Sequence, residues 1–395
     1  MLVMSQYGAK LKLALLFALL VFPIFINIGF SGSIRFDADP FNNLGAPSLP
    51  LSVLFFCVLF VLSCFRLKLT RNIYVLVMIL LLYLIGNIMV SGNIRPFIIF
   101  FGLVVPILNY FIVREYIIRS NAAVDAHEIF YLVVSCIVLS KFLIDLLFFG
   151  NAFSNYFITK DIVIYNYYDY FPFVYLLTLL MAYQMMLFRK YVLFSVIVCF
   201  VCYSCIFFSY SRLYQVLSVL LVPLFVSLKC VRLPVAFVFY TSLAIVIVLS
   251  IVVGILGGEN LEESLSVRFA HWHHFLLTLN FYELIFPFLN SYRQEMNSGS
   301  FHNEFLEIFS YFGVSVFLYF YIVNEIFVKV QPKFSVISSV LAFSLMTGML
   351  VQLNITNPYI GIIWSTFMAT ISCRPVHIFS YENNLVNKKC SMAIG

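Results

Sequence analysis

Arg212 lies where a charged side chain is costly, which makes it the first candidate for chemistry. It closes the polar step Ser209-Tyr210-Ser211-Arg212, which separates two long apolar runs. A charge so close to the hydrocarbon core generally faces a cavity or a partner. A guanidinium binds phosphate or carboxylate through a planar, permanently charged fork. We therefore expect Arg212, with Ser211 beside it, to bind an anionic ligand.

A second group of residues joins a guanidinium to an aromatic ring. Arg268 and Trp272 are four apart, so a helix would place both on one face. This pairing suits a phosphate or a sugar ring. Three nearby histidines, His271, His273 and His274, could also be metal ligands. A zinc site needs converging ligands and usually a cysteine or carboxylate as well, so we expect no metal here.

His302 stands at the start of a later apolar run. The positive end of a helix dipole would disfavour imidazolium there, so His302 could act as a neutral base near pH 7. The alternative is a histidine that merely lies at the membrane interface. Asn303 could bind substrate or cap the helix. Glu304 and Glu307 are further candidates, as groups that orient an acceptor or replace the base.

The composition indicates that these candidate residues are positioned by membrane-spanning segments. Of the 395 residues, 63% are hydrophobic and 10% are charged, whereas a soluble domain carries about 25% charged residues. The net charge of +6 does not indicate a nucleic-acid partner, because the basic residues are short interruptions between apolar runs. We expect a single integral membrane domain over residues 1–395.

The apolar runs predict an all-α transmembrane bundle. About 20 apolar residues cross the hydrocarbon core as a helix, and this rule gives about 12 spans. Their expected ranges are 11–30, 49–65, 72–91, 96–113, 128–149, 171–188, 191–208, 213–228, 233–256, 305–328, 334–353 and 357–373.

The positions of lysine and arginine predict which side each loop faces. Positive residues favour the cytoplasmic side, and this pattern fits a chain with both termini inside. The outer segments then hold only Arg35, Arg95, Lys160, Arg212, Arg268 and Arg293. For Arg35 and Arg95 we favour a snorkelling contact with lipid headgroups over a functional role.

The longest outer segment, residues 257–304, falls between the ninth and tenth spans. Connections are usually only a few residues long. A loop of this length with Trp, Tyr, Phe and His residues is expected to be ordered and functional. Lys141 and Asp145 lie four apart in the fifth span. They form either a substrate or proton path or a self-neutralising pair facing the bundle.

Three motifs resemble those of the Wzy-type O-antigen polymerases and the related O-antigen ligases. They are Ser211-Arg212 at the opening of a span, Ser-x-Arg-x-x-x-Trp at Ser266, Arg268 and Trp272, and His302-Asn303 followed by Leu306 and Gly313. A large outer loop before the last three spans also fits. The chain departs from the pattern before the His-Asn pair, where only Gly299 remains of a glycine-rich stretch.

The resemblance implies a glycosyltransferase of the bacterial inner membrane that joins undecaprenyl-diphosphate-linked oligosaccharide units on the periplasmic side, for the O-antigen of lipopolysaccharide. The growing glycan would be the donor and one new lipid-linked unit the acceptor. Arginines would stabilise charge on the departing diphosphate, and His302 would take the proton of the acceptor hydroxyl. The implied charge-stabilising residues are Arg212, Arg268 and Arg293, and the implied substrate contacts are Ser211, Trp272, Asn303 and Glu304.

No metal or other cofactor is implied, because lipid diphosphate is already an activated leaving group. The expected partners are the lipid-linked donor and acceptor and the membrane lipid, and a chain-length regulator protein is a further candidate. An O-antigen ligase, which transfers glycan to lipid A-core, is one alternative. A lipid-linked oligosaccharide flippase is another, but a transporter should carry more charges inside its spans and shorter outer loops. The sequence therefore favours the polymerase.

Overall fold

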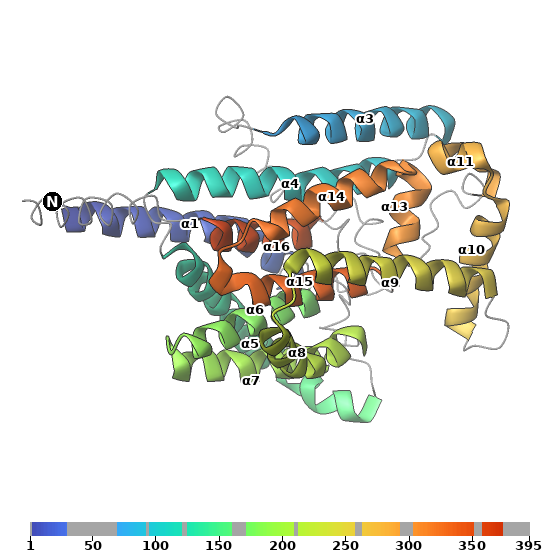
Figure 1. Ribbon diagram of the computed structural model, residues 1–395. Coiled ribbons are helices and arrows are strands. Elements are labelled where there is room, and N and C mark those ends of the chain that lie inside the picture. Colours follow the sequence, from blue (N-terminus) through green and yellow to red (C-terminus); the bar gives the residue numbers. More distant parts are fainter. Residues whose placement is uncertain are drawn as a thin grey trace, which may run out of the picture.

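The computed structural model describes residues 2–29, 69–91, 95–120, 125–159, 171–208, 212–256, 263–292, 303–350 and 358–373. These residues form helices joined by short connections, and no strand occurs among them (Figure 1). The expected all-α class is therefore confirmed for this part of the chain. The helices of its first half are α1 (Leu2–Gly29), α3 (Arg71–Ser91), α4 (Arg95–Arg119), α5 (Ala126–Thr159), α6 (Phe171–Leu187) and α7 (Val192–Phe208).

The second half of the chain continues the bundle and adds several short helices. Its elements are α8 (Arg212–Val231), α9 (Val235–Leu256), α10 (Glu263–Thr278), α11 (Phe281–Ile285), the 3-10 turns η2 (Pro287–Leu289) and η3 (Pro332–Phe334), α13 (Glu304–Phe312), α14 (Ser315–Val328), α15 (Ser335–Gly348) and α16 (Pro358–Ser372). Most of the expected spans coincide with one of these helices. The expected span 49–65 lies outside the described residues.

The lengths and apolar character of the helices indicate a multi-pass membrane protein. Five described stretches are long and apolar enough to cross a bilayer: Arg71–Val90, Arg95–Arg119, Ala126–Leu143, Leu213–Val231 and Val235–Leu256. Taken together, α14 and the η3–α15 segment are also long and apolar enough to span a bilayer, although the chain bends by 112° between them. The total of about 12 spans and the inward position of both termini remain predictions.

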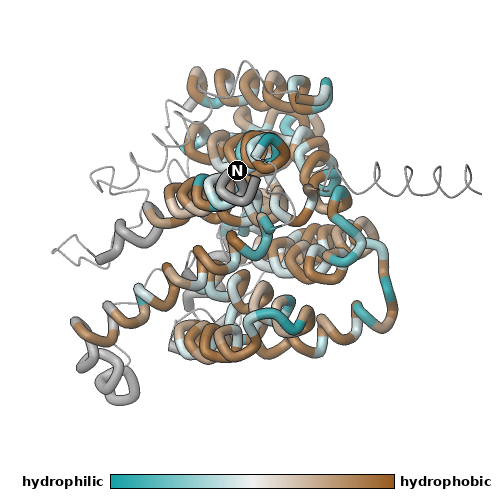
Figure 2. The backbone as a smooth tube through the Cα atoms, turned by 90° about the vertical axis from the view of Figure 1, so that its left-hand side faces the viewer, coloured by the Kyte–Doolittle hydropathy of each residue, from teal (hydrophilic) through white to brown (hydrophobic). Residues whose placement is uncertain are grey.

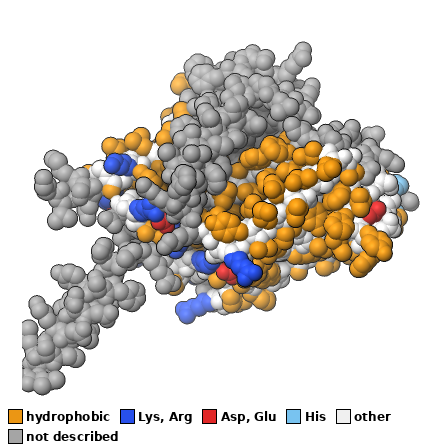
Figure 3. Space-filling view, turned by 90° about the horizontal axis from the view of Figure 1, so that it is seen from above, with side chains coloured by type: hydrophobic (Ala, Val, Ile, Leu, Met, Phe, Trp, Pro, Cys, Tyr) orange, Lys and Arg blue, Asp and Glu red, His pale blue; other side chains and the backbone are white. Residues whose placement is uncertain are grey.

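The surface of the bundle is apolar along the helices. Leu82 of α3 is 65% exposed and Val219 of α8 is 71% exposed. Hydrophobic residues dominate most helices along their length in Figure 2. Figure 3 shows apolar side chains over the middle of one face, with Lys and Arg atoms gathered toward one side. Since soluble monomers rarely expose apolar patches of this extent, we interpret this surface as facing lipid.

The tightest contact between helices joins α4 to α16. The side-chain amide of Asn109 donates to Ser365 Oγ at 2.8 Å and to Thr366 Oγ1 at 2.9 Å. At Gly361, a Cβ atom would lie 2.3 Å from Pro106 Cγ, so only glycine permits this approach. Small residues and polar side chains are the usual means of packing helices in lipid.

The helix expected over 305–328 is in fact broken into α13 and α14 at Gly313. Gly313 has a φ of +54°, and a Cβ there would lie 2.8 Å from the carbonyl oxygens of Leu284 and Ile285. The positive φ suits glycine, so the helix ends here and the chain turns. In Figure 1, α13 lies across the end of the bundle while α14 runs back into it.

The predicted loop 257–304 is mostly helical where it is described. Its helices α10 and α11 lie at the same end of the bundle as α13, which we call the loop end (Figure 1). Phe288 packs its ring against Gly86 of α3, where a Cβ would be 2.8 Å from the ring. Over residues 263–292 this segment forms α10, α11 and η2.

Candidate functional site

The short helix α13 is the centre of the candidate site, because it carries polar groups into a buried position at the loop end. All nine of its residues are buried. Glu304 and Glu307 lie in its first turns and are both 0% exposed. A carboxylate deprived of water is costly unless it is paired or hydrogen-bonded, so the surroundings of these two residues define the site.

Asn303 caps α13 and ties it to α9. Its Oδ1 accepts from the backbone N–H of Leu306 at 3.0 Å, and its Nδ2 donates to Ser250 Oγ at 2.8 Å. Ser250 in turn donates to the Val246 carbonyl. The capping alternative considered for Asn303 is therefore present in the structure. The Asn303 side chain is fully buried, and its two hydrogen bonds hold the start of α13 against α9.

Glu307 forms an ion pair with Arg95, the first residue of α4. Arg95 Nε lies 2.8 Å from Glu307 Oε1, and the arginine side chain is only 18% exposed. The expectation that Arg95 merely contacts lipid headgroups is wrong, because its guanidinium pairs with a buried carboxylate. Nothing in the sequence could have indicated this partner, since the two residues lie on helices distant in the chain.

Glu304 anchors the start of α13 to a third helix. Its backbone N–H donates to the Met349 carbonyl, just after α15, at 2.8 Å. Its carboxylate lies close enough to the buried Tyr319 of α14 for the two groups to interact electrostatically. A carboxylate and a phenol are therefore both buried in the region of the first turn of α13.

The helix α10 packs on the same part of α9 that holds Asn303. Trp272 is 5% exposed and lies over Gly254, one helical turn beyond Ser250. Its ring also meets that of Phe269 at 5.0 Å. Arg268 and Trp272 share one helix, as expected. Most of the indole is buried against α9, however, which leaves little of it exposed as a platform for a sugar.

Two of the three histidines of α10, His271 and His274, neighbour Tyr292, whereas His273 contacts the backbone of α9. His271 Nδ1 lies 2.6 Å from Tyr292 Oη, and His273 Nδ1 lies 2.8 Å from the Gly254 carbonyl oxygen. The His274 ring is 5.6 Å from the Tyr292 ring. Burial lowers the pKa of His271, and the neighbouring His274 lowers it further. Among the described residues, no group of His, Cys, Asp and Glu is arranged to hold a metal ion.

Comparisons with protein-family models, curated proteins and solved structures find no match for this chain. The site must therefore be interpreted from its own residues and their neighbours.

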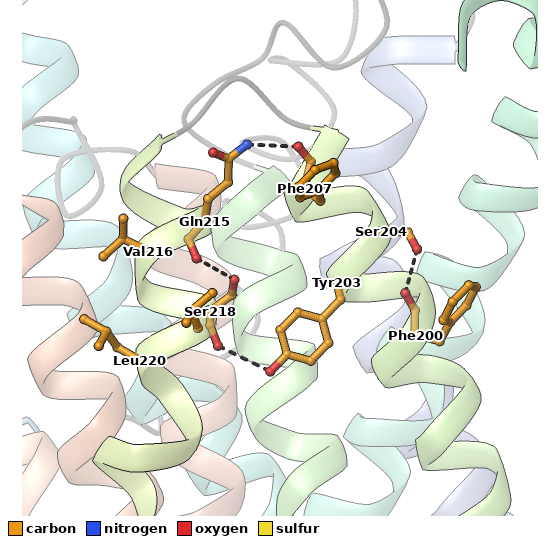
Figure 4. A pocket seen from close by; sticks show the side chains of 9 residues that line it. Phe200, Tyr203, Ser204, Phe207, Gln215, Val216, Ser218 and Leu220 are labelled. Atoms are coloured by element: carbon orange, nitrogen blue, oxygen red, sulfur yellow. Dashed lines mark hydrogen bonds between the residues drawn. The ribbon is translucent and has the colours of Figure 1, made fainter. Parts of the chain in front are cut away.

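An apolar crevice of about 690 Å³ lies between α7 and α8 (Figure 4). Its walls include Phe200, Tyr203, Phe207, Val219 and Leu220. Phe200 is 69% exposed and Val219 is 71% exposed, so the crevice opens sideways onto the apolar surface. At one end it is lined by Phe207, near the end of α7, and by Gln215, in the first turn of α8.

Polar groups line the inner wall of this crevice. Gln215 Nε2 donates to the Phe207 carbonyl at 2.9 Å and so joins the ends of α7 and α8. Tyr203 Oη donates to the Ser218 carbonyl at 3.3 Å, and Tyr183 Oη lies 2.5 Å from Tyr203 Oη. These bonds hold α6, α7 and α8 together behind the apolar opening.

The structure brings some of the predicted site residues together and leaves others undescribed. Trp272, Asn303 and Glu304 gather around one stretch of α9 and the start of α13. Arg212 and Arg268 have helical backbones, but their side chains are not described. Ser211, Arg293 and His302 lie outside the described residues, and so does the side chain of Asp145.

Proposed function

We propose that this chain is an O-antigen polymerase, a glycosyltransferase that joins lipid-diphosphate-linked oligosaccharide units. The observation that carries the proposal is the position of α13. It places two fully buried carboxylates, and the arginine that pairs with Glu307, at one end of an apolar bundle, directly after the His302-Asn303 pair in the sequence. Ionisable groups inside a membrane protein are costly and mark a functional site by default.

The proposed reaction transfers a glycan from lipid diphosphate to a hydroxyl. The acceptor oxygen attacks the anomeric carbon, the bond to the diphosphate breaks, and lipid diphosphate leaves with the electron pair. Arg212, Arg268 and Arg293 are assigned to the charge that develops on the diphosphate. His302 is assigned to the proton of the acceptor hydroxyl. No metal or other cofactor is needed in this scheme.

The crevice between α7 and α8 supports a lipid-linked donor. It is apolar and open to the surface that we interpret as facing lipid, and one end of it lies in the first turn of α8, the helix that begins with Arg212. The hydrocarbon tail of the substrate would fit the apolar wall, and Arg212 is assigned to its anionic head.

The proposal includes a location and a topology. The chain would lie in a bacterial inner membrane with about 12 spans and both termini in the cytoplasm. The loop end, with α10 and α13, would then face the periplasm. Lipid-linked units that have been flipped across the membrane would meet the site on that side.

Replacing the proposed base tests the function directly. In a deletion strain of the source bacterium that expresses the His302→Ala variant, long-chain O-antigen is expected to disappear, because the acceptor hydroxyl loses its base. Lipopolysaccharide capped by one repeat should persist. A silver-stained gel of lipopolysaccharide reads both outcomes, and His377→Ala, in the segment after α16, is the matched control.

The other outcomes separate the competing functions. A normal ladder of chain lengths in His302→Ala would remove the proposed role of this histidine. In the deletion strain without a plasmid, a bare lipid A-core would indicate a ligase. Repeat units stranded on the inner leaflet would indicate a flippase. Only loss of the ladder with retention of a single repeat supports the polymerase.

A further inference from the structure

The helix α13 is held by a separate contact on each neighbouring element. Asn303 bonds to Ser250 of α9, and the Glu304 N–H bonds to the Met349 carbonyl. At its other end, the Tyr311 carbonyl accepts from Nδ2 of Asn87 on α3 at 2.8 Å. A nine-residue helix placed across the end of a bundle has little intrinsic stability. Its position is therefore set by these contacts.

The ion pair with Arg95 acts next to the start of α13. Glu307 lies one turn after the cap, and its N–H donates to the Asn303 carbonyl at 2.9 Å. The Glu307 carboxylate is fully buried, whereas Arg95 keeps 18% exposure. A buried carboxylate whose partner is removed must change its protonation or its position. The pair therefore couples the first turn of α13 to the first residue of α4.

We propose that Arg95 is a positioning residue: through Glu307 it fixes the first turn of α13, and with it the placement of the cap residue Asn303, which directly follows His302 in the sequence. The consequence for catalysis rests on the proposed function, but the consequence for α13 does not. In this assignment Arg95 supports the site and does not merely contact lipid headgroups.

The test compares three variants with the wild-type chain in lipid nanodiscs. Arg95→Met removes the partner and leaves the carboxylate buried. Arg95→Lys keeps a positive charge but not the guanidinium. The double variant Arg95→Met with Glu307→Met removes both charges and keeps apolar bulk, an exchange that buried pairs often tolerate. Lys329→Ala is the matched control, since Lys329 pairs with Glu325 on an exposed part of α14.

The first readout is hydrogen exchange of residues 304–312, followed by mass spectrometry. Arg95→Met is expected to speed exchange there about tenfold or more, because the first turn loses its tie to α4. Exchange in α16 should not change. Arg95→Lys should be intermediate, and the double variant should return close to the wild-type rate. Unchanged exchange in Arg95→Met would overturn the proposal.

The second readout is polymerisation with a purified lipid-linked repeat unit. Turnover in Arg95→Met is expected to fall on the order of 10²-fold, as for a misplaced catalytic group, with KM within about twofold of the wild type. The double variant should recover most of this turnover. If it recovers normal exchange but no turnover, Arg95 or Glu307 acts on the substrate itself and a positioning role is wrong.

The two readouts also separate this proposal from the proposed function. A wild-type chain that does not polymerise would defeat the function, while the exchange data would still decide how α13 is held. If Arg95→Met does not fold, the comparison of Arg95→Lys and the double variant with the wild type decides instead. A double variant that folds but exchanges as fast as an unanchored helix would contradict the proposal.

Discussion

At the scale of single residues, the described site contains groups whose neighbours set their chemistry. Glu307 is a buried carboxylate with an arginine beside it, and Asn303 is a cap with both amide atoms bonded. Removing one partner of a buried pair generally costs about 3–5 kcal/mol, because the remaining charge is left without compensation. Asn303 and Glu307, which follow His302 in the sequence, are thus structural supports whose loss is costly.

His271 makes the packing of α10 sensitive to pH. Its pKa lies below the ordinary value because of burial and of His274, so folding favours the neutral ring. The unfolded segment takes up a proton first as the pH falls below about 6.5. Stability from this residue is therefore full above that pH and is lost progressively below it. Hydrogen exchange of residues 263–292 is expected to accelerate between pH 7 and pH 5.

The variant His271→Gln checks the cause of this pH dependence. Glutamine can still bond to Tyr292 but does not titrate, so the acceleration of exchange should become smaller. A pH response that is identical in His271→Gln and the wild type would assign it to another group.

At the scale of elements, Gly313 determines how α13 leaves the bundle. The substitution Gly313→Ala places a Cβ against two carbonyl oxygens and forces a positive φ on alanine. We expect a loss of about 1–3 kcal/mol from the backbone strain alone and a lower melting temperature in detergent. The proposed polymerase activity should fall by more than the loss of stability alone explains, because α13 would tilt.

Gly8→Ala provides the control for this prediction. Nothing lies within 4 Å of a Cβ at Gly8 of α1, so alanine is expected to be neutral there or slightly stabilising. Equal melting temperatures for the Gly313→Ala, Gly8→Ala and wild-type chains would show that the break in the helix does not depend on glycine.

The sequence was sufficient to predict most helices but not the break between α13 and α14. The length of an apolar run indicates a span directly, because the bilayer sets it, and so α3, α7, α9 and α16 begin and end close to the expected residues. Gly313 stands inside an apolar run and looks like any other small residue of a membrane helix. Its role depends on the carbonyl groups of Leu284 and Ile285, which only folding brings close.

The candidate site could likewise be predicted only in part, because some of its contacts form only on folding. The order of motifs drew attention to the start of α13, where Asn303 and Glu304 are buried, and their roles as substrate contacts stay predictions. The ion pair of Arg95 with Glu307 could not be predicted, because neither residue type nor spacing connects the two positions. Helical spacing also placed Arg268 and Trp272 on one face, but could not show that this face packs on α9.

At the scale of the whole molecule, the two ends of the bundle are expected to face different compartments. Lys10 pairs with Asp125 and Lys190 with Glu128 at the end opposite the loop end. Fusions of alkaline phosphatase after Ser120 and Lys190 should be inactive and a fusion after Asn280 active, with fluorescence of green fluorescent protein in the reverse pattern. Phosphatase activity after Ser120 would invert the proposed topology.

The contact between α4 and α16 has a consequence for biosynthesis. Asn109 enters the membrane with an early helix, but the hydroxyls of Ser365 and Thr366 that accept from its amide are translated much later. Until α16 inserts, the Asn109 amide lacks these two acceptors, and a buried polar group without its hydrogen bonds is costly. Completion of the fold is therefore coupled to the arrival of α16. A chain whose synthesis stops before residue 358 lacks the contact between α4 and α16.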